Sequence, residues 1–168
     1  MQSMFTTITL PETINYMGDY AFSTCDYLEN VVIPETCHFE YFGMNVFTTT
    51  PFEAEIYSKD ETIFGENVLY SYIGSADEYV IPEKIDIIAN NCFFMSGVKS
   101  VVINDNIKEI TPYAFASCRN LTTINIPDSV EYIYDGAFQD SGLEAITLGK
   151  GVKYTGERIR RKAGKTGK

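Results

Sequence analysis

One tripeptide pattern recurs along the chain: an aliphatic residue, then proline or a substitute, then in most copies an acidic residue. Successive copies are separated by 23, 48, 22, 23 and 22 residues. The copies are Leu10-Pro11-Glu12, Ile33-Pro34-Glu35, Ile81-Pro82-Glu83, Ile103-Asn104-Asp105, Ile126-Pro127-Asp128 and Leu148-Gly149-Lys150. Periods of this length are typical of solenoids, in which each unit buries its apolar side against its neighbours. The pattern therefore predicts a stack of coils without a central pocket, and it favours binding over catalysis.

Each unit repeats the same order of apolar positions. Val101 and Ile103 flank an outward residue, as in a short strand whose apolar side chains point inward. Proline, or the residue in its place, then ends the strand because proline cannot donate to a ladder of hydrogen bonds. An Ala-Phe pair such as Ala114-Phe115 fills the interior on a short helical or 3₁₀ turn. We therefore predict a mainly β repeat solenoid of about six coils.

The separation of 48 residues marks an insertion at about residues 53–80. Two segments near its end, 68–73 and 78–81, are rich in β-branched and aromatic residues, and turn-forming residues 74–77 lie between them. We predict that these two segments form a β-hairpin that projects from the stack or extends it. The rest of residues 1–156 is expected to form one solenoid domain.

The formal charge is distributed unevenly along the 168 residues. Residues 1–149 hold 22 acidic and 5 basic side chains, a net charge of -17, whereas residues 150–168 hold 1 acidic and 8 basic side chains, a net charge of +7. An acidic body repels phosphate backbones, so we expect no nucleic acid partner. We expect residues 157–168 to be a disordered basic tail, with an interaction tail as the alternative.

The sequence contains no run of 18 apolar residues, so we expect no membrane insertion. The first residues also lack the basic start and apolar stretch of a signal peptide. Repeat material begins by Ile8 without a polar capping repeat before it, and an uncapped solenoid end exposes its core and a strand edge. We therefore expect either a monomer or a piece of a longer chain.

Two stretches carry the repeat almost whole, from Ile103 to Leu121 and from Ile126 to Leu143. Their spacing of isoleucine, valine, Ala-Phe, cysteine and leucine resembles the BspA-type (Treponema pallidum-type) leucine-rich repeat of bacterial surface proteins. The resemblance covers about residues 8–155. It implies a curved, right-handed solenoid in a secreted or surface-anchored protein that binds host or neighbouring-cell components. It implies no catalytic residue, because the family motif consists of packing positions.

Nothing in the sequence forms a catalytic constellation, and we expect neither enzyme activity nor a cofactor. His38 is the only histidine and follows Cys37, but neighbours in an extended chain point in opposite directions. The four cysteines lack the close spacing of metal ligands. We interpret them as buried packing residues, with a disulfide or a reactive thiol as the alternative: Cys25, Cys37, Cys92 and Cys118.

Acidic residues occupy one repeat position and should form a ladder along the stack. Adjacent coils lie about 4.8 Å apart, and like charges at that distance repel by about 1 kcal/mol in water. A divalent cation or a basic partner would relieve this repulsion, whereas exposed turn residues would simply swing apart. The ladder is a weak metal candidate at Glu83, Asp105 and Asp128, and Glu12 and Glu35 hold the same position.

The outward positions of the predicted strands form a second candidate surface. They are small, mostly uncharged and often β-branched, which suits the docking of a protein ligand but also any exposed strand. Beside them, two tyrosines in another outward position offer contact anchors. The candidate ligand-binding residues are Thr9, Val32, Val80, Val102, Asn125, Thr147, Tyr132 and Tyr154.

Two functions are compatible with these patterns. The first is a non-catalytic binding module of a bacterial surface or secreted protein, with a protein or glycan ligand. The alternative is a structural spacer that holds another domain away from the cell and has no ligand of its own. An extracellular or cell-surface location follows only from the family resemblance.

Overall fold

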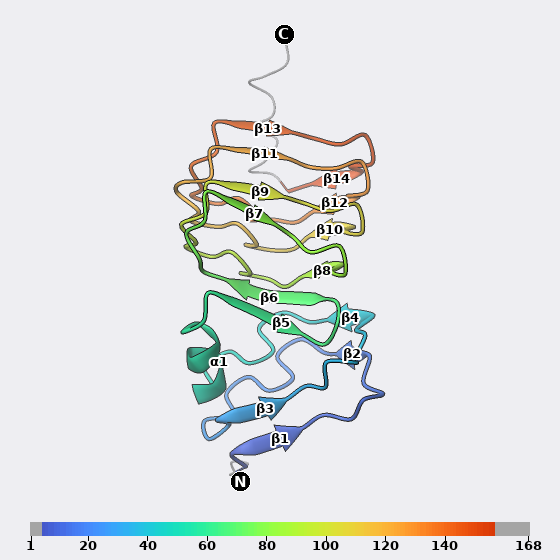
Figure 1. Cartoon of the computed structure of the whole chain (residues 1–168), viewed down its shortest axis with the longest axis vertical. Helices are drawn as coiled ribbons and strands as arrows, with labels where there is room; N and C mark the ends of the chain where they lie inside the picture. The colour runs from blue at the N-terminus through green and yellow to red at the C-terminus, as the bar shows by residue number, and fades with distance from the viewer. Residues whose placement is uncertain (1–4, 157–168) are drawn as a thin grey trace.

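The computed structural model describes residues 5–156 as a mainly β solenoid of about seven turns, stacked along one axis (Figure 1). The seventh turn, beyond the six expected, comes from the insertion, which contributes a turn of its own. Within residues 5–156, helix is confined to one short segment. No helix in the described part of the chain is long and apolar enough to cross a membrane. The predicted basic tail, 157–168, lies outside the described residues.

Three-residue strands form one side of the stack. In each, the outer two residues face solvent and the middle residue packs inward, as the sequence predicts. They pair in parallel as β1 with β3, β7 with β9, and β11 with β13. We call their outward surface the long-strand face. These strands are β1 (Thr7–Thr9), β3 (Asn30–Val32), β7 (Glu78–Val80), β9 (Ser100–Val102), β11 (Thr123–Asn125) and β13 (Ala145–Thr147).

Two-residue strands form a second side, in a separate column in Figure 1. In most of them the first residue faces out and the second packs inward. The column is divided, because β2 pairs with β4, while β10, β12 and β14 form another sheet. The strands are β2 (Tyr16–Met17), β4 (Tyr41–Phe42), β8 (Ile87–Ile88), β10 (Glu109–Ile110), β12 (Tyr132–Ile133) and β14 (Tyr154–Thr155).

The third side is a series of tight turns that carry the repeat phenylalanines inward. In one of them, Ala114 N donates to Thr111 O over 3.3 Å, as in a single helical turn. Tyr113 and Ser117 have φ angles of 58° each, and left-handed residues at this spacing stop the turn from continuing as a helix. The rings stack from turn to turn, with centroids 4.7 Å apart for Phe93 and Phe115.

The insertion contains a helix and a hairpin, but the hairpin joins other segments than the sequence predicted. Helix α1 (Pro51–Ile56) begins at Thr50, whose hydroxyl accepts from Glu53 N. Strand β5 (Glu61–Phe64) then pairs antiparallel with β6 (Val68–Tyr72). The predicted partner of β6 was the segment 78–81, which instead forms β7 and pairs in parallel with β9. That prediction was therefore wrong.

The reason for this pairing is burial. All five residues of β6 are buried, and β6 is flanked by β5 on one side and by β8 on the other. Residues 74–77 are a corner that leads from one side of the solenoid to the next. The hairpin turn is instead at Gly65, which has a φ of +56° and lies where a Cβ atom would meet the carbonyl of Cys37.

Strand β6 separates two hydrophobic clusters. Val68 and Tyr70 pack into the first, which holds the N-terminal coils and α1. Leu69 and Tyr72 pack into the second, which continues through the C-terminal coils. The insertion is therefore part of the core, and it changes how neighbouring coils meet.

The phenylalanine column provides a test of this core. Phe93 is fully buried, whereas the next residue, Phe94, is 43% exposed. Phe93→Ala should lower the free energy of unfolding by about 3–5 kcal/mol, because it leaves a cavity between stacked coils. Phe94→Ala, its matched control, should change it by no more than about 0.5 kcal/mol. Urea unfolding would measure both, and equal losses would contradict the packing described.

Candidate functional site

The long-strand face is open to solvent and nearly uncharged. Val32, Val80 and Val102 are 50%, 57% and 44% exposed. Strands β9 and β11 lie side by side but belong to different sheets, and a shallow depression of about 240 Å³ lies over them. Val102 and Asn125 both line this depression. The structure thus brings two of the predicted ligand-binding residues to one concave spot on this face.

The eight candidate residues divide between two columns of the stack. Thr9, Thr147 and the others on three-residue strands are exposed on the long-strand face. Tyr132 and Tyr154 lie instead on β12 and β14, where the pairing places one directly beside the other. The tyrosines therefore belong to the short-strand column and not to the predicted face.

The acidic ladder is exposed but does not converge on a common point. Asp128 accepts a hydrogen bond from the backbone N–H of Lys150 over 2.7 Å, so this carboxylate helps to hold the following coil. Glu83 and Asp105 are exposed turn residues. Among residues 5–156, no three histidine, cysteine or acidic side chains are grouped so that they could hold a metal ion.

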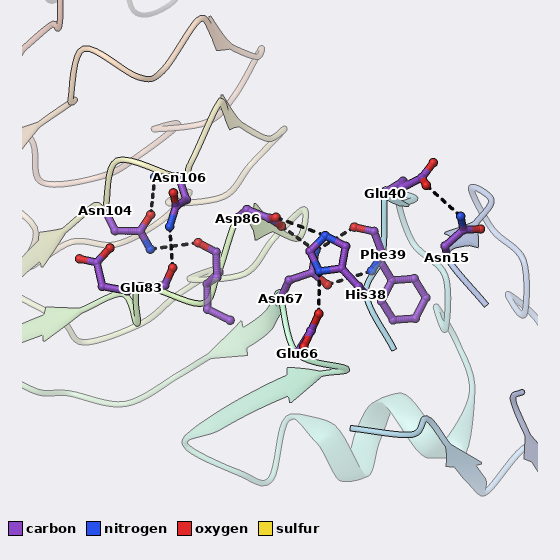
Figure 2. A network of polar contacts seen from close by, with 11 residues as sticks. Asn15, His38, Phe39, Glu40, Glu66, Asn67, Glu83, Asp86, Asn104 and Asn106 are labelled. Carbon is purple, nitrogen blue, oxygen red and sulfur yellow. Dashed lines mark hydrogen bonds and ion pairs between the residues drawn. The ribbon is translucent and has the colours of Figure 1, made fainter. Parts of the chain in front are cut away.

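Cys37 and His38 have separate partners. Cys37 is buried, and its Sγ lies 3.6 Å from the carbonyl oxygen of Pro11. Burial raises the pKa of its thiol. His38 is exposed, with Nδ1 at 3.0 Å from Glu66 and Nε2 at 3.8 Å from Asp86 (Figure 2). Cys37 and His38 therefore do not form a pair in which the imidazole could activate the thiol.

A larger concavity, which the sequence did not reveal, lies on the short-strand side. We call it the short-strand groove; its volume is about 590 Å³. It lies over the break in the short-strand column, where β4, β8 and β10 belong to three different sheets. Its apolar lining includes Phe39, Phe42, Ile87 and Ile88. Its polar lining includes His38, Glu40, Asp86, Asn106, Lys108, Glu109 and Thr111, and Tyr41 and Tyr134 add two aromatic rings.

A buried asparagine spans this break beside the groove. Asn67 Nδ2 donates to the carbonyl of Phe39 over 2.8 Å, and Asn67 Oδ1 accepts from Phe39 N over 2.9 Å. The side chain thus pairs as a strand backbone would. The same Nδ2 donates to Asp86 over 2.6 Å, and the carbonyl of Asn67 accepts from Asp86 N and Ile87 N. Figure 2 shows Asn67 between the coil of Phe39 and the coil of Asp86.

A pair of asparagines, Asn45 and Asn90, also crosses the break, from the turn side. Asn90 Oδ1 accepts from Asn45 N, and Asn90 Nδ2 donates to Asn45 Oδ1, each over 3.1 Å. The coils on either side of the groove are therefore joined by side-chain amides where backbone pairing stops. Such links fix the width of the opening.

The aromatic rings of the groove are also held in place. Tyr41 donates to Asp19 over 2.7 Å, and its ring lies against Tyr16 with centroids 4.9 Å apart. This hydrogen bond raises the pKa of Tyr41 to about 12 and lowers the pKa of Asp19. Burial, and then the negative charge of Glu109, raise the pKa of Tyr134. Both phenols are therefore protonated hydrogen-bond donors at neutral pH.

A comparison with known families accounts for the repeat. A family model described as the BspA type leucine rich repeat region matches residues 1–120 and 62–162, in six copies. The chain belongs to the BspA-type leucine-rich repeat family. This result confirms the resemblance drawn from the repeat strings.

Solved structures give a similar result for the fold. The chain is similar to a leucine rich cell surface protein from Faecalibacterium prausnitzii A2-165, with 18% sequence identity and a TM-score of 0.50. The match covers 87% of this chain and 54% of that one, so this chain spans about half the length of its structural neighbour. At this identity the likeness shows the fold alone. No curated protein matches the chain.

Three of the polar side chains beside the groove come from the insertion and from the coil after it. Asn67 lies in the insertion, and Asn90 and Asp86 belong to the coil that follows it. One signal was present in the sequence, since Asn67 stands next to an apolar segment that is buried throughout. A polar residue beside a fully buried strand needs partners within the protein.

The bridging role of Asn67 leads to a test. Asn67→Asp removes the donor to Phe39 O and places a carboxylate next to Asp86 in a buried position. We expect a loss of at least about 2 kcal/mol in the free energy of unfolding. The same substitution at an exposed position, Asn30→Asp, should change the free energy of unfolding little. Urea unfolding at neutral pH would measure both, and a tolerated Asn67→Asp would show that the bridge is dispensable.

The thiols lead to a second test. Burial raises the pKa of Cys37, Cys92 and Cys118, the last to about 12, and Cys25 is the one free cysteine among the described residues that is not fully buried. Iodoacetamide at pH 8 should therefore alkylate Cys25 first, and the other three only after unfolding, because the thiolate is the reacting form. Peptide mass spectrometry would assign the sites. Early labelling of Cys37 would indicate an activated thiol.

Proposed function

We propose that this chain is a non-catalytic binding module of a bacterial surface or secreted protein. Its ligand is a protein or glycan of the host or of a neighbouring cell, and the binding surface is the long-strand face. Membership in the BspA-type family and the similarity to a cell surface protein support this location and role. Between residues 5 and 156 the buried repeat positions fill the interior of the stack, which favours recognition on its outside.

The observation that carries this proposal is the composition of the long-strand face. Twelve outward positions on six strands include a single charged residue, Glu78, although charged residues make up 21% of the chain. Three half-exposed valines lie among small polar residues, and a depression opens between β9 and β11. A surface depleted of charge and locally hollow is typical of the centre of a protein interface.

Two lysines introduced into this face test the proposal. Val102→Lys together with Asn125→Lys places two charges at the depression, without touching the core. Binding to an array of immobilised host extracellular proteins and glycans should fall at least about tenfold, because a charge would have to be desolvated at the contact. Surface plasmon resonance would measure the affinity, and the melting temperature should not change.

The matched control carries two lysines elsewhere. Tyr20→Lys with Tyr113→Lys changes two exposed residues on the turn side, which are 55% and 45% exposed. This variant should bind as the wild type does. A wild-type chain that captures nothing from the array would support the spacer function, and unchanged capture by the Val102→Lys, Asn125→Lys variant would exclude the long-strand face.

A further inference from the structure

The short-strand groove combines features of a ligand site that the proposed function does not use. It is about 590 Å³ in volume, within the range of about 300–1,000 Å³ that is usual for small-molecule sites. It lies on the short-strand column, apart from the long-strand face. We propose that this groove binds a segment of a neutral oligosaccharide.

The balance of donors and acceptors argues for a neutral, hydroxyl-rich ligand. Glu40, Asp86 and Glu109 are acceptors, Lys108 is a donor, and the amide of Asn106 is both. An anion would meet three carboxylates, whereas a cation would be attracted by them but would leave the ammonium of Lys108 without an acceptor. A sugar hydroxyl donates one hydrogen bond and accepts others, so each of these groups can be satisfied by the same ligand.

The carboxylates are also partly compensated within the chain. Glu40 accepts from Asn15 over 3.0 Å, Asp86 accepts from Asn67 over 2.6 Å, and Glu109 lies close enough to Tyr134 for its charge to raise the pKa of that phenol. A carboxylate has about four lone-pair positions, so each retains capacity for a ligand hydroxyl. Because two of these charges already have donors, a cationic ligand gains less from them than it would from bare carboxylates.

Two fixed tyrosine rings supply the apolar part of the contact. Tyr41 is oriented by Asp19 and Tyr16, and Tyr134 lies against Tyr132 with ring centroids 6.4 Å apart. The face of an aromatic ring is electron-rich, and the C–H groups on the flat side of a sugar ring are its natural partners. Since both rings are held before a ligand arrives, little ordering entropy is lost on binding.

One hydroxyl in the lining lacks a partner. Thr111 Oγ1 is buried and makes no hydrogen bond within the described residues. Buried polar atoms without partners are rare because each costs the full desolvation of the group. The atom is shielded from solvent, so a ligand hydroxyl would reach it after the Thr111 side chain turns toward the groove. This observation is independent of the charge balance and of the tyrosine rings.

Direct binding of short sugars tests the proposal. The probes are four neutral tetrasaccharides (maltotetraose, cellotetraose, mannotetraose and lacto-N-tetraose), with sialyllactose as the anionic arm and tetralysine as the cationic arm. Saturation-transfer NMR would detect binding, and calorimetry would give the dissociation constant. We expect at least one neutral tetrasaccharide to bind, and the two charged probes to bind at least about tenfold more weakly.

Variants in the groove then locate the site. Tyr134→Ala should weaken binding of that tetrasaccharide about tenfold, whereas Tyr134→Phe keeps the ring and should stay within about threefold of the wild type. Glu109→Gln keeps the shape but replaces an acceptor by a donor, and should weaken binding about threefold or more. The Val102→Lys, Asn125→Lys variant should bind the sugar normally, which separates this inference from the proposed function.

Three results would overturn the proposal. One is that none of the four neutral tetrasaccharides binds. Another is a sugar that binds equally well to Tyr134→Ala, Glu109→Gln and the wild type. The third is that tetralysine binds more tightly than every sugar and that Glu109→Gln weakens this binding. That result would identify the groove as a site for basic peptides.

Discussion

The spacing between coils is the constraint on which the structure depends. Backbone bonds such as Phe93 N to Ala114 O and Phe115 N to Ala137 O, both 2.7 Å, hold consecutive coils at the separation of neighbouring strands. A ring at this spacing packs best on an identical ring, and Phe115 and Phe138 are within 5° of parallel. The ring position is therefore filled by phenylalanine in successive coils, as at Phe93, Phe115 and Phe138. Packed apolar side chains fill the interior of the described coils, so a ligand has access to their outer surface.

The insertion also keeps the spacing between coils, but part of its strand pairing is antiparallel. Strand β6 continues the stack toward β8, but its other neighbour is the antiparallel β5, so the ladder of parallel short strands does not run through from β4 to β8. The polar groups at this junction still need partners. The amide of Asn67 provides them, because a side-chain amide carries the same donor and acceptor as a peptide group. The break is thus stable, and it leaves an opening at the surface.

Much of this fold follows from the sequence because the repeat couples local pattern to burial. Val101, Ile124 and their equivalents were expected to point inward, and they do. The hairpin was mispredicted because segments 68–73 and 78–81 look locally like paired strands, while Glu61–Phe64 has a weaker pattern. Thr50-Pro51 was a helix-start signal that the periodic pattern obscured. The groove could not be predicted, since it joins residues from several coils, from His38 to Tyr134, and depends on which strands fail to pair.

Regular coils and interrupted coils produce different kinds of surface. Where pairing is regular, as between β12 and β14, Tyr154 sits directly beside Tyr132 and the outer surface stays flat. A stack of uniform coils can therefore offer broad, flat faces suited to large partners. A concave site of several hundred Å³ requires that one coil leave the register, and here the insertion between β4 and β8 does so. The residues that line the groove belong to the coils before and after the insertion, and strand β6 of the insertion packs into both cores between them. In this chain, the opening that a small ligand would meet lies where the insertion interrupts the pairing of the short strands.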